Sequence, residues 1–163
     1  MKYLLINRHA KSPWNNFNIS DHDRELNSQG VNDALSMGKR LLAKGISFNL
    51  IVTSSATRAL TTSQLIASEI NYPLDEIRVE KGIYGANSDD LKDMIHEIDN
   101  DVDSLAMFGH NPALHMLSED LMGEKIRKFP TCSMSYFELK TDDWKKINKC
   151  DSKMLFFDHP NNG

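Results

Sequence analysis

The sequence predicts an α/β fold in which helices cover both faces of a mostly parallel sheet. Short apolar runs alternate along the chain with segments whose apolar residues recur at helical spacing, as far as Gly123. Beyond Gly123 the pattern changes, because residues 134–139 alternate in the way that is typical of an antiparallel strand. We therefore expect a three-layer α/β/α sandwich with a mostly parallel central sheet and antiparallel C-terminal strands.

The first predicted strand is the apolar run at the start of the chain, which ends in the adjacent pair Arg8 and His9. A polar loop of fourteen residues, 12–25, follows, and loops of this length in compact domains are often functional. Asn27 is then placed to cap a helix whose apolar residues recur at helical spacing, and Gly45 ends this helix.

Two further pairs of a strand and a helix are expected in the middle of the chain. Residues 48–53 form a strand, and Ser54 or Ser55 caps the helix that follows it. Residues 77–79 form a short strand, and Ser88 caps the next helix. This alternation predicts βαβ units.

The last parallel strand is predicted over residues 105–108, and Pro112 fits the first position of the helix that follows. Residues 144–149 are expected to return as the hairpin partner of the strand 134–139. We find no repeat and no linker, so residues 1–163 are predicted to form a single domain.

The composition limits the classes of function that need to be considered. A hydrophobic content of 40% argues against disorder, and a net charge of -4 gives no general attraction to nucleic acid or to an acidic membrane surface. Cys132 and Cys150 lack CxxC spacing, and no apolar stretch approaches the length of a membrane span. We expect a cytoplasmic protein.

Four cationic or imidazole side chains follow the predicted strands at their carboxyl ends. Arg8 and His9 leave the first strand, Arg58 lies in the first turn of the helix after the second, and His110 follows the strand 105–108. Ligands of open α/β sheets bind at this edge. If these strands are parallel neighbours, the four side chains converge on one small volume.

Such a group of side chains is suited to a phosphoryl group. Arginine presents a fork of donors that matches phosphate oxygens, and a helix N-terminus adds free N–H groups. A neutral imidazole can attack phosphorus while the cations stabilise the charge of the transition state. Each residue also has a simpler explanation, because Arg8 alone suits a surface ion pair and His110 alone suits a helix cap.

Three motifs carry a resemblance to a known family. They are Arg-His-Ala-Lys-Ser-x-Trp at residues 8–14, Asp-x-x-Arg-x-Leu-Asn-x-x-Gly at 21–30 and Gly-His-Asn-Pro at 109–112, with Arg58 within Ser-Ser-Ala-Thr-Arg-Ala. The chain resembles the histidine phosphatase superfamily, and within it the SixA-type branch of phosphohistidine phosphatases.

The resemblance implies a phosphoglycerate-mutase-like fold and a phosphatase whose nucleophile is His9. It implies that Arg8, Arg58 and His110 bind the phosphoryl group, and that the substrate is a phosphohistidine-bearing protein. No metal-ligand spacing emerges from the sequence, and this chemistry needs no metal and no cofactor. Other polar groups of the loop are further candidates for phosphate binding; these are Ser12 and Asn15.

The chain departs from larger members of the family at one place. They carry a glutamate after the third strand that protonates an alcohol leaving group, whereas residues 82–86 read Gly-Ile-Tyr-Gly-Ala here. General acid catalysis contributes about 10²–10⁴-fold, so its loss favours a phosphoramidate such as phosphohistidine, which leaves more easily.

Two alternatives remain open at this point. Instead of a phosphohistidine phosphatase, the chain could encode a small-molecule phosphomonoesterase or phosphomutase. The other alternative is a non-catalytic module that binds a phosphorylated ligand, although a binder has no need of His9. Arg24 equally suits a structural role, in which it pairs with Asp21 or Asp23. The sequence does not identify the natural substrate, the proton donor, the oligomeric state or the pathway.

Overall fold

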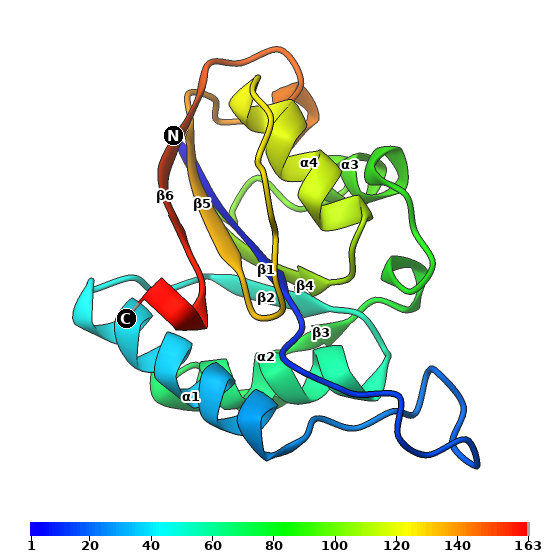
Figure 1. The fold of residues 1–163 in the computed structure, drawn as a ribbon. Helices are drawn as coiled ribbons and strands as arrows, with labels where there is room; N and C mark the ends of the chain where they lie inside the picture. The colour runs from blue at the N-terminus through cyan, green and yellow to red at the C-terminus, as the bar shows by residue number, and fades with distance from the viewer. Residues whose placement is uncertain (163) are drawn as a thin grey trace.

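The computed structural model describes residues 1–162, and its centre is one six-stranded sheet (Figure 1). The strands are β1 (Lys2–Arg8), β2 (Leu50–Thr53), β3 (Arg78–Val79), β4 (Ser104–Gly109), β5 (Met134–Leu139) and β6 (Ser152–Asp158). Their order in the sheet is β3-β2-β4-β1-β5-β6. The first four strands pair in parallel, while β5 and β6 run antiparallel to their neighbours.

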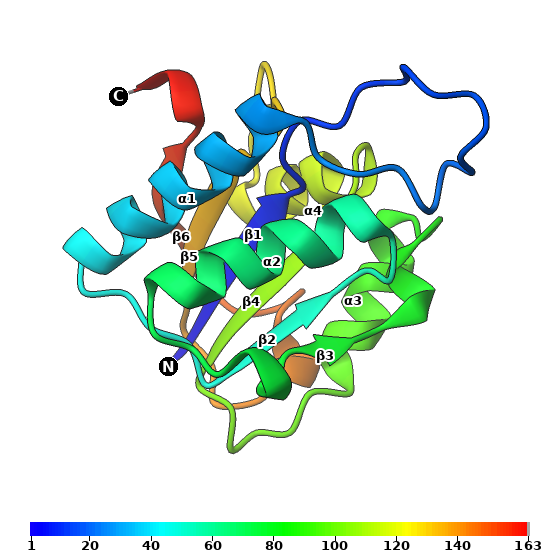
Figure 2. The same ribbon diagram turned by 90° about the horizontal axis from the view of Figure 1, so that it is seen from below.

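Four helices cover the two faces of this sheet. They are α1 (Ser28–Ala43), α2 (Thr57–Glu69), α3 (Ser88–His96) and α4 (Ala113–Met122). Helices α1 and α2 pack together on one face, and α3 and α4 pack together on the other (Figure 2). The predicted fold class, a three-layer sandwich with antiparallel C-terminal strands, is confirmed.

Each face of the sheet has its own apolar core, and β1 contributes to both. Leu4 and Ile6 are fully buried on the side of α3 and α4, whereas Leu5 is fully buried on the side of α1 and α2. Side chains alternate between the two faces of a strand, so a strand that is covered on both faces is apolar along its whole length. This explains why β1 reads as a continuous apolar run.

Several predicted helix ends are confirmed. The side chain of Asn27 accepts a hydrogen bond from the N–H of Gly30, and α1 ends shortly before Gly45, which has a φ of 71°. Helix α4 ends at Gly123, which lies in the left-handed region. None of the helices within residues 1–162 is long and apolar enough to cross a membrane.

The predicted caps of α2 were wrong, and the reason lies in the neighbouring histidines. The helix starts at Thr57, and its N-cap is Ala56, which makes no side-chain cap. The hydroxyl oxygen of Ser54 lies 2.8 Å from Nε2 of His110, and that of Ser55 lies 2.9 Å from Nε2 of His22. Both serines hold imidazoles and do not cap the helix.

Two other predicted helix starts were displaced by one residue. The N-cap of α3 is Asn87, not Ser88, because Asn87 and Asp90 form a reciprocal capping box. Pro112 is the N-cap of α4 and not its first helical residue.

The predicted partner of β5 was also wrong. Residues 144–149 do not form a strand, since a short 3-10 helix covers Trp144–Lys146, and β6 pairs with β5 instead. Trp144 is fully buried in the core beside α3 and α4, and its indole N–H donates to the carbonyl of Val102 at 2.8 Å. An apolar residue that fills a core from a turn has the same sequence signal as a strand residue.

The two ends of the loop 12–25 are held together by close backbone packing. The N–H of Asn27 donates to the carbonyl of Lys11 at 3.1 Å, and a Cβ at Gly30 would lie 2.3 Å from the same carbonyl oxygen. Only glycine fits at this position. The start of α1 therefore fixes the base of the loop against the end of β1.

We expect Asn87→Ala to lower the free energy of unfolding by about 1 kcal/mol, because it removes the side-chain oxygen that accepts from the N–H of Asp90. Ser88→Ala is the matched control and should change stability by less than about 0.5 kcal/mol. Urea unfolding followed by circular dichroism measures both. If Ser88→Ala proved the more damaging substitution, the assignment of the cap to Asn87 would be wrong.

Candidate active site

The predicted site residues lie at the carboxyl ends of three adjacent parallel strands. β4 lies between β1 and β2, and Arg8 is in register with Gly109. His9 and His110 follow directly, and their ring centroids are 5.3 Å apart. The parallel register therefore brings together two imidazoles that are one hundred and one residues apart in the chain.

The backbone of His9 is fixed on both sides by hydrogen bonds. Its N–H donates to the carbonyl of Gly109 at 3.1 Å, and its carbonyl accepts from the N–H of Cys132 at 2.9 Å. The next residue, Ala10, donates its N–H to the hydroxyl of Thr62 on α2 at 2.9 Å. His9 is thus held between β4, the start of β5 and α2.

The side chain of His9 has a defined tautomer. Its Nδ1 lies 2.7 Å from the carbonyl oxygen of Ala10, and a carbonyl only accepts, so Nδ1 carries the proton. Burial is the main cause that lowers the pKa of His9 to about 3; the Ala10 contact opposes this, while His110, Arg58 and Arg8 favour it. The ring is therefore neutral at ordinary pH, and its Nε2 holds a free electron pair.

Arg58 is buried in the first turn of α2 and is held by the loop. Its Nη1 donates to the backbone carbonyl of Asp21 at 2.6 Å, and its Nη2 pairs with the Asp21 carboxylate at 3.1 Å. Arg24 donates from Nε to the same carboxylate at 3.1 Å, and the hydroxyl of Tyr84 donates to it at 2.5 Å. Asp21 thus joins three donors from three parts of the chain.

This network keeps Asp21 ionised. Desolvation favours the neutral form, but the hydrogen bond from Tyr84 and the contacts with Arg58 and Arg24 outweigh it and lower the pKa to about 2. The same hydrogen bond to Asp21 is the first cause that raises the pKa of Tyr84. At neutral pH, Asp21 is therefore an acceptor and holds no proton to donate.

Arg8 and His110 complete the group. Nη1 of Arg8 donates to the carbonyl of Phe129 at 3.0 Å, and burial followed by the charge of Arg58 lowers the pKa of Arg8. Burial and Arg58 are also the leading causes that lower the pKa of His110 to about 4. His110 is therefore neutral, with Nε2 bonded to Ser54.

Three nitrogen atoms of this group are buried without a hydrogen-bond partner among the described residues. They are Nε of Arg8, Nε of Arg58 and Nδ1 of His110. Buried polar atoms are nearly always paired, and an unsatisfied one costs free energy. Two positively charged side chains with spare donors, next to two neutral imidazoles, form a site that an anion with several oxygens would complete.

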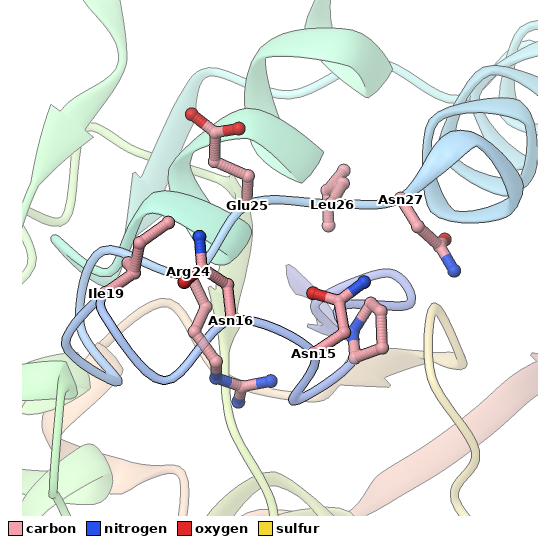
Figure 3. A pocket seen from close by; sticks show the side chains of 8 residues that line it. Asn15, Asn16, Ile19, Arg24, Glu25, Leu26 and Asn27 are labelled. Atoms are coloured by element: carbon pink, nitrogen blue, oxygen red, sulfur yellow. The ribbon is translucent and has the colours of Figure 1, made fainter.

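The structure places the other predicted site residues in the loop. The hydroxyl of Ser12 donates to the carbonyl of Glu25 at 2.7 Å, and Asn15 lines a separate cavity of the loop (Figure 3). Arg24 donates to the carbonyl of Ser12 and pairs with Asp21, which agrees with the structural role considered for it. A part for Ser12 or Asn15 in phosphate binding stays a prediction.

The sequence did not identify two groups of this site. Tyr84 lies after the short 3-10 helix Lys81–Ile83, and its ring meets those of His110 and His22 edge to face, with centroids 5.6 Å and 5.0 Å away. Ser54 was assigned to a helix cap. Ser54 lies within the motif Ser-Ser-Ala-Thr-Arg-Ala, but no spacing indicates its contact with His110 or that of Tyr84 with Asp21, because these partners are far away in the chain.

Metal-ligating side chains do not gather in this region. Within residues 1–162, the structure contains no group of three or more histidine, cysteine, aspartate or glutamate side chains that could hold a metal ion.

A comparison with protein families agrees with this geometry. A model of the histidine phosphatase superfamily (branch 1) matches residues 4–100, which carry Arg8, His9 and Arg58. The chain belongs to the histidine phosphatase superfamily. The suspected family is confirmed.

Curated relatives match different shares of the chain. A 2,3-bisphosphoglycerate-dependent phosphoglycerate mutase of Methylobacterium sp. (strain 4-46) is 36% identical over 110 residues, which are 58% of this chain and 53% of that protein. An uncharacterized chloroplastic protein of Arabidopsis thaliana is 25% identical over 151 residues, and the match covers 88% of this chain and 69% of that protein. The chain spans about half the length of the mutase.

Solved structures of the superfamily share the whole fold. A protein histidine phosphatase SixA complexed with tungstate superposes with a TM-score of 0.84 at 20% identity, over 98% of each chain. A candidate phosphohistidine phosphatase SixA from Agrobacterium tumefaciens gives the same score at 23% identity, again over 98% of each chain. At these identities the likeness establishes the fold.

We expect His9 to be neutral, with its proton on Nδ1, at pH 6. The usual histidine pKa is near 6.5, whereas burial lowers that of His9 to about 3. Long-range ¹⁵N–¹H correlation spectra measure the tautomer and its titration, and His9→Gln assigns the signal. A ring that is half protonated between pH 6 and 7 would contradict the expected burial effect.

We expect Asp21→Asn to lower kcat/KM by about tenfold, the equivalent of one hydrogen bond to a charged group, because Arg58 and Arg24 lose an ionised partner. Asp23→Asn is the matched control, since the Asp23 carboxylate is exposed and pairs only with His22 and not with Arg58. Steady-state phosphate release measures both variants. Equal activity of both would show that Asp21 does not position the pocket.

Proposed function

We propose that the protein is a phosphatase that removes the phosphoryl group from phosphohistidine on a protein, through a phosphohistidine intermediate on His9. One observation carries this proposal. The free Nε2 electron pair of a neutral, buried His9 lies beside a group of side chains with spare N–H donors on Arg8 and Arg58 and an unpartnered Nδ1 on His110, which carries the proton when the hydroxyl of Ser54 donates to Nε2 of that ring.

In the first step, Nε2 of His9 attacks phosphorus, and the bond between phosphorus and the nitrogen of the substrate imidazole breaks. The electron pair of that bond goes to the leaving imidazole, which departs as a neutral ring because its other nitrogen carries a proton. The guanidinium groups of Arg8 and Arg58 and the Nδ1–H of His110 stabilise the charge on the equatorial oxygens. The Ala10 carbonyl keeps the His9 ring in position and stabilises the positive charge that the ring gains.

In the second step, water attacks the phosphorus of phosphorylated His9. The bond to Nε2 breaks, inorganic phosphate leaves, and His9 returns to its neutral form. The same donors act in both steps because the phosphoryl oxygens stay in contact with Arg8 and Arg58 while phosphorus moves between the leaving and entering groups.

The protonation of Asp21 bears on the choice of substrate. The carboxylate of Asp21 is bonded to Arg58, which binds the phosphoryl group in the proposed mechanism. Three donors hold this carboxylate ionised, so it is poorly suited to protonate an alkoxide. The hydroxyl of Tyr84 is bonded to that anion and its pKa is raised, which makes it a weak acid. A phosphoramidate needs less help from an acid than an alkyl phosphate, and this favours phosphohistidine.

A phosphomutase is the second candidate, because a relative with 36% identity is described as one. A mutase must keep its intermediate from water until the substrate binds again. The chain spans only about half of that relative's length. A hydrolase does not need to keep its intermediate from water.

We expect N-phosphoimidazole to be hydrolysed at a rate that exceeds that for an alkyl phosphate by at least about 10²-fold, since only the latter needs a general acid. When the reaction with radiolabelled N-phosphoimidazole is quenched at alkaline pH, an acid-sensitive label should remain on the wild-type protein. His9→Ala should carry no such label.

Arg58→Ala should remain folded and lose about 10²-fold or more in kcat/KM.

The controls separate the three candidate functions. Phosphate release that requires a bisphosphate primer would indicate a mutase. Binding of N-phosphoimidazole without trapped label or phosphate release, with equal affinity in His9→Ala, would indicate a binding module. Faster hydrolysis of the alkyl phosphate would contradict phosphohistidine as the substrate.

A further inference from the structure

Three aromatic side chains are exposed among residues 1–162; two belong to the loop 12–25, and the third, Tyr84, bonds to Asp21 of that loop. Phe17 is 90% exposed, Trp14 is 59% exposed and Tyr84 is 37% exposed. We call these three residues the aromatic rim. Trp14 and Phe17 belong to the loop 12–25, which stands out from the body of the molecule in Figure 2. Single exposed apolar residues are common, but three exposed aromatic residues on or bonded to one loop are not.

The aromatic rim is connected to the phosphoryl-binding group by consecutive contacts. The ring of Trp14 lies 4.2 Å from the guanidinium of Arg24, and Arg24 pairs with Asp21. The hydroxyl of Tyr84 bonds to the same carboxylate, which also holds Arg58. A ligand that places its phosphoryl group at Arg58 therefore lies beside Tyr84 and at the base of the loop that carries Trp14.

The loop also encloses a cavity of about 190 Å³ that is distinct from the phosphoryl-binding group (Figure 3). Neither His9 nor His110 lines it, whereas Asn16 and Ile19, which lie on either side of Phe17 in the chain, both do. Its lining residues are Pro13, Asn15, Asn16, Ile19, Arg24, Glu25, Leu26 and Asn27. The cavity has the size of one side chain or two, and its wall combines apolar, amide and charged groups.

We infer that the aromatic rim and this cavity form the docking surface for the protein whose phosphohistidine enters the pocket. The inference rests on the proposed function, because it names where that substrate binds outside its phosphoryl group. Aromatic anchors surrounded by asparagine are typical of protein-binding surfaces, since aromatic rings bury a large area with little loss of conformational freedom. Phe17 lies outside the phosphoryl-binding group, so only a macromolecular substrate contacts both.

The exposed side chains of the loop support an apolar contact rather than an electrostatic one. Asp21, Asp23 and Glu25 outnumber Arg24 within residues 12–25, but Asp21 is paired with Arg24 and Arg58, and the side chains of Trp14 and Phe17 are uncharged. The partner that fits is a folded protein with an apolar patch beside its phosphorylated histidine. Binding of such a patch depends little on salt.

Phe17→Ser tests this surface without touching the phosphoryl-binding group. The probes are N-phosphoimidazole and a panel of small folded proteins, each phosphorylated on a surface histidine with phosphoramidate. We expect at least one protein to be turned over with a higher kcat/KM than N-phosphoimidazole. For that protein, Phe17→Ser should lower kcat/KM by about tenfold, mainly through KM, as expected for a central aromatic anchor, and should leave turnover of N-phosphoimidazole unchanged.

Leu74→Ser is the matched control, because Leu74 is an exposed apolar residue on the short helix Leu74–Glu76, away from the loop. It should change neither activity. The inference is overturned if no phosphorylated protein has a higher kcat/KM than N-phosphoimidazole. It is also overturned if Phe17→Ser lowers kcat/KM for the protein and for N-phosphoimidazole together, or lowers neither. It is also overturned if Phe17→Ser instead turns a dimer into a monomer in sedimentation experiments, since the rim would then join two copies of this chain.

The outcomes distinguish this inference from the proposed function. If N-phosphoimidazole is not hydrolysed at all by the wild-type protein, the proposed function is wrong. If it is hydrolysed, and the ratio of the two activities is the same in wild type and Phe17→Ser, the function stands and the docking surface is wrong.

Discussion

The candidate site depends on the ion pair between Asp21 and Arg58. A guanidinium that is only 6% exposed needs a charged partner, because an isolated buried charge is very costly. Asp21 provides that partner from the loop, and it is held in turn by Arg24 and Tyr84. The same contact thus makes a buried cation possible and fixes a long loop to the start of α2.

The two imidazoles reduce the electrostatic cost of this arrangement. Burial and the neighbouring guanidiniums lower the pKa values of His9 and His110, so both rings are neutral and add no further positive charge. Among the described residues, Arg58 pairs with Asp21, whereas Arg8 forms no ion pair. This leaves a group with net positive charge and unpartnered N–H donors, and the same causes leave His9 with a free electron pair for attack.

Patterns that are local in the sequence predicted most of the fold. Strands β1 and β4 are apolar runs because both faces are covered, and their parallel register is enough to bring His9 next to His110. The same reasoning failed where a contact joins distant parts of the chain. Trp144 fills a core from a turn, and Asp21 meets Tyr84 across 63 residues without any spacing that could reveal it.

The start of α2 illustrates how a site can override a local preference. A serine before a helix normally caps it, and the run Ser54 and Ser55 offers two candidates. Both hydroxyls lie within hydrogen-bond distance of histidines, and the helix begins without a side-chain cap. The lost cap costs about 1 kcal/mol. In return, His110 gains a fixed orientation beside His9.

The chemistry of the pocket leads to a conclusion about selectivity. In the proposed mechanism Arg8, Arg58 and His110 contact only the phosphoryl group, which is the same in every phosphorylated substrate. They cannot distinguish one phosphoprotein from another. Discrimination must come from the leaving group, because the ionised Asp21 holds no proton for an alkoxide, and from surfaces outside the pocket. Phe17, an exposed aromatic residue of the loop, belongs to such a surface, because it lies outside the group that binds the phosphoryl oxygens.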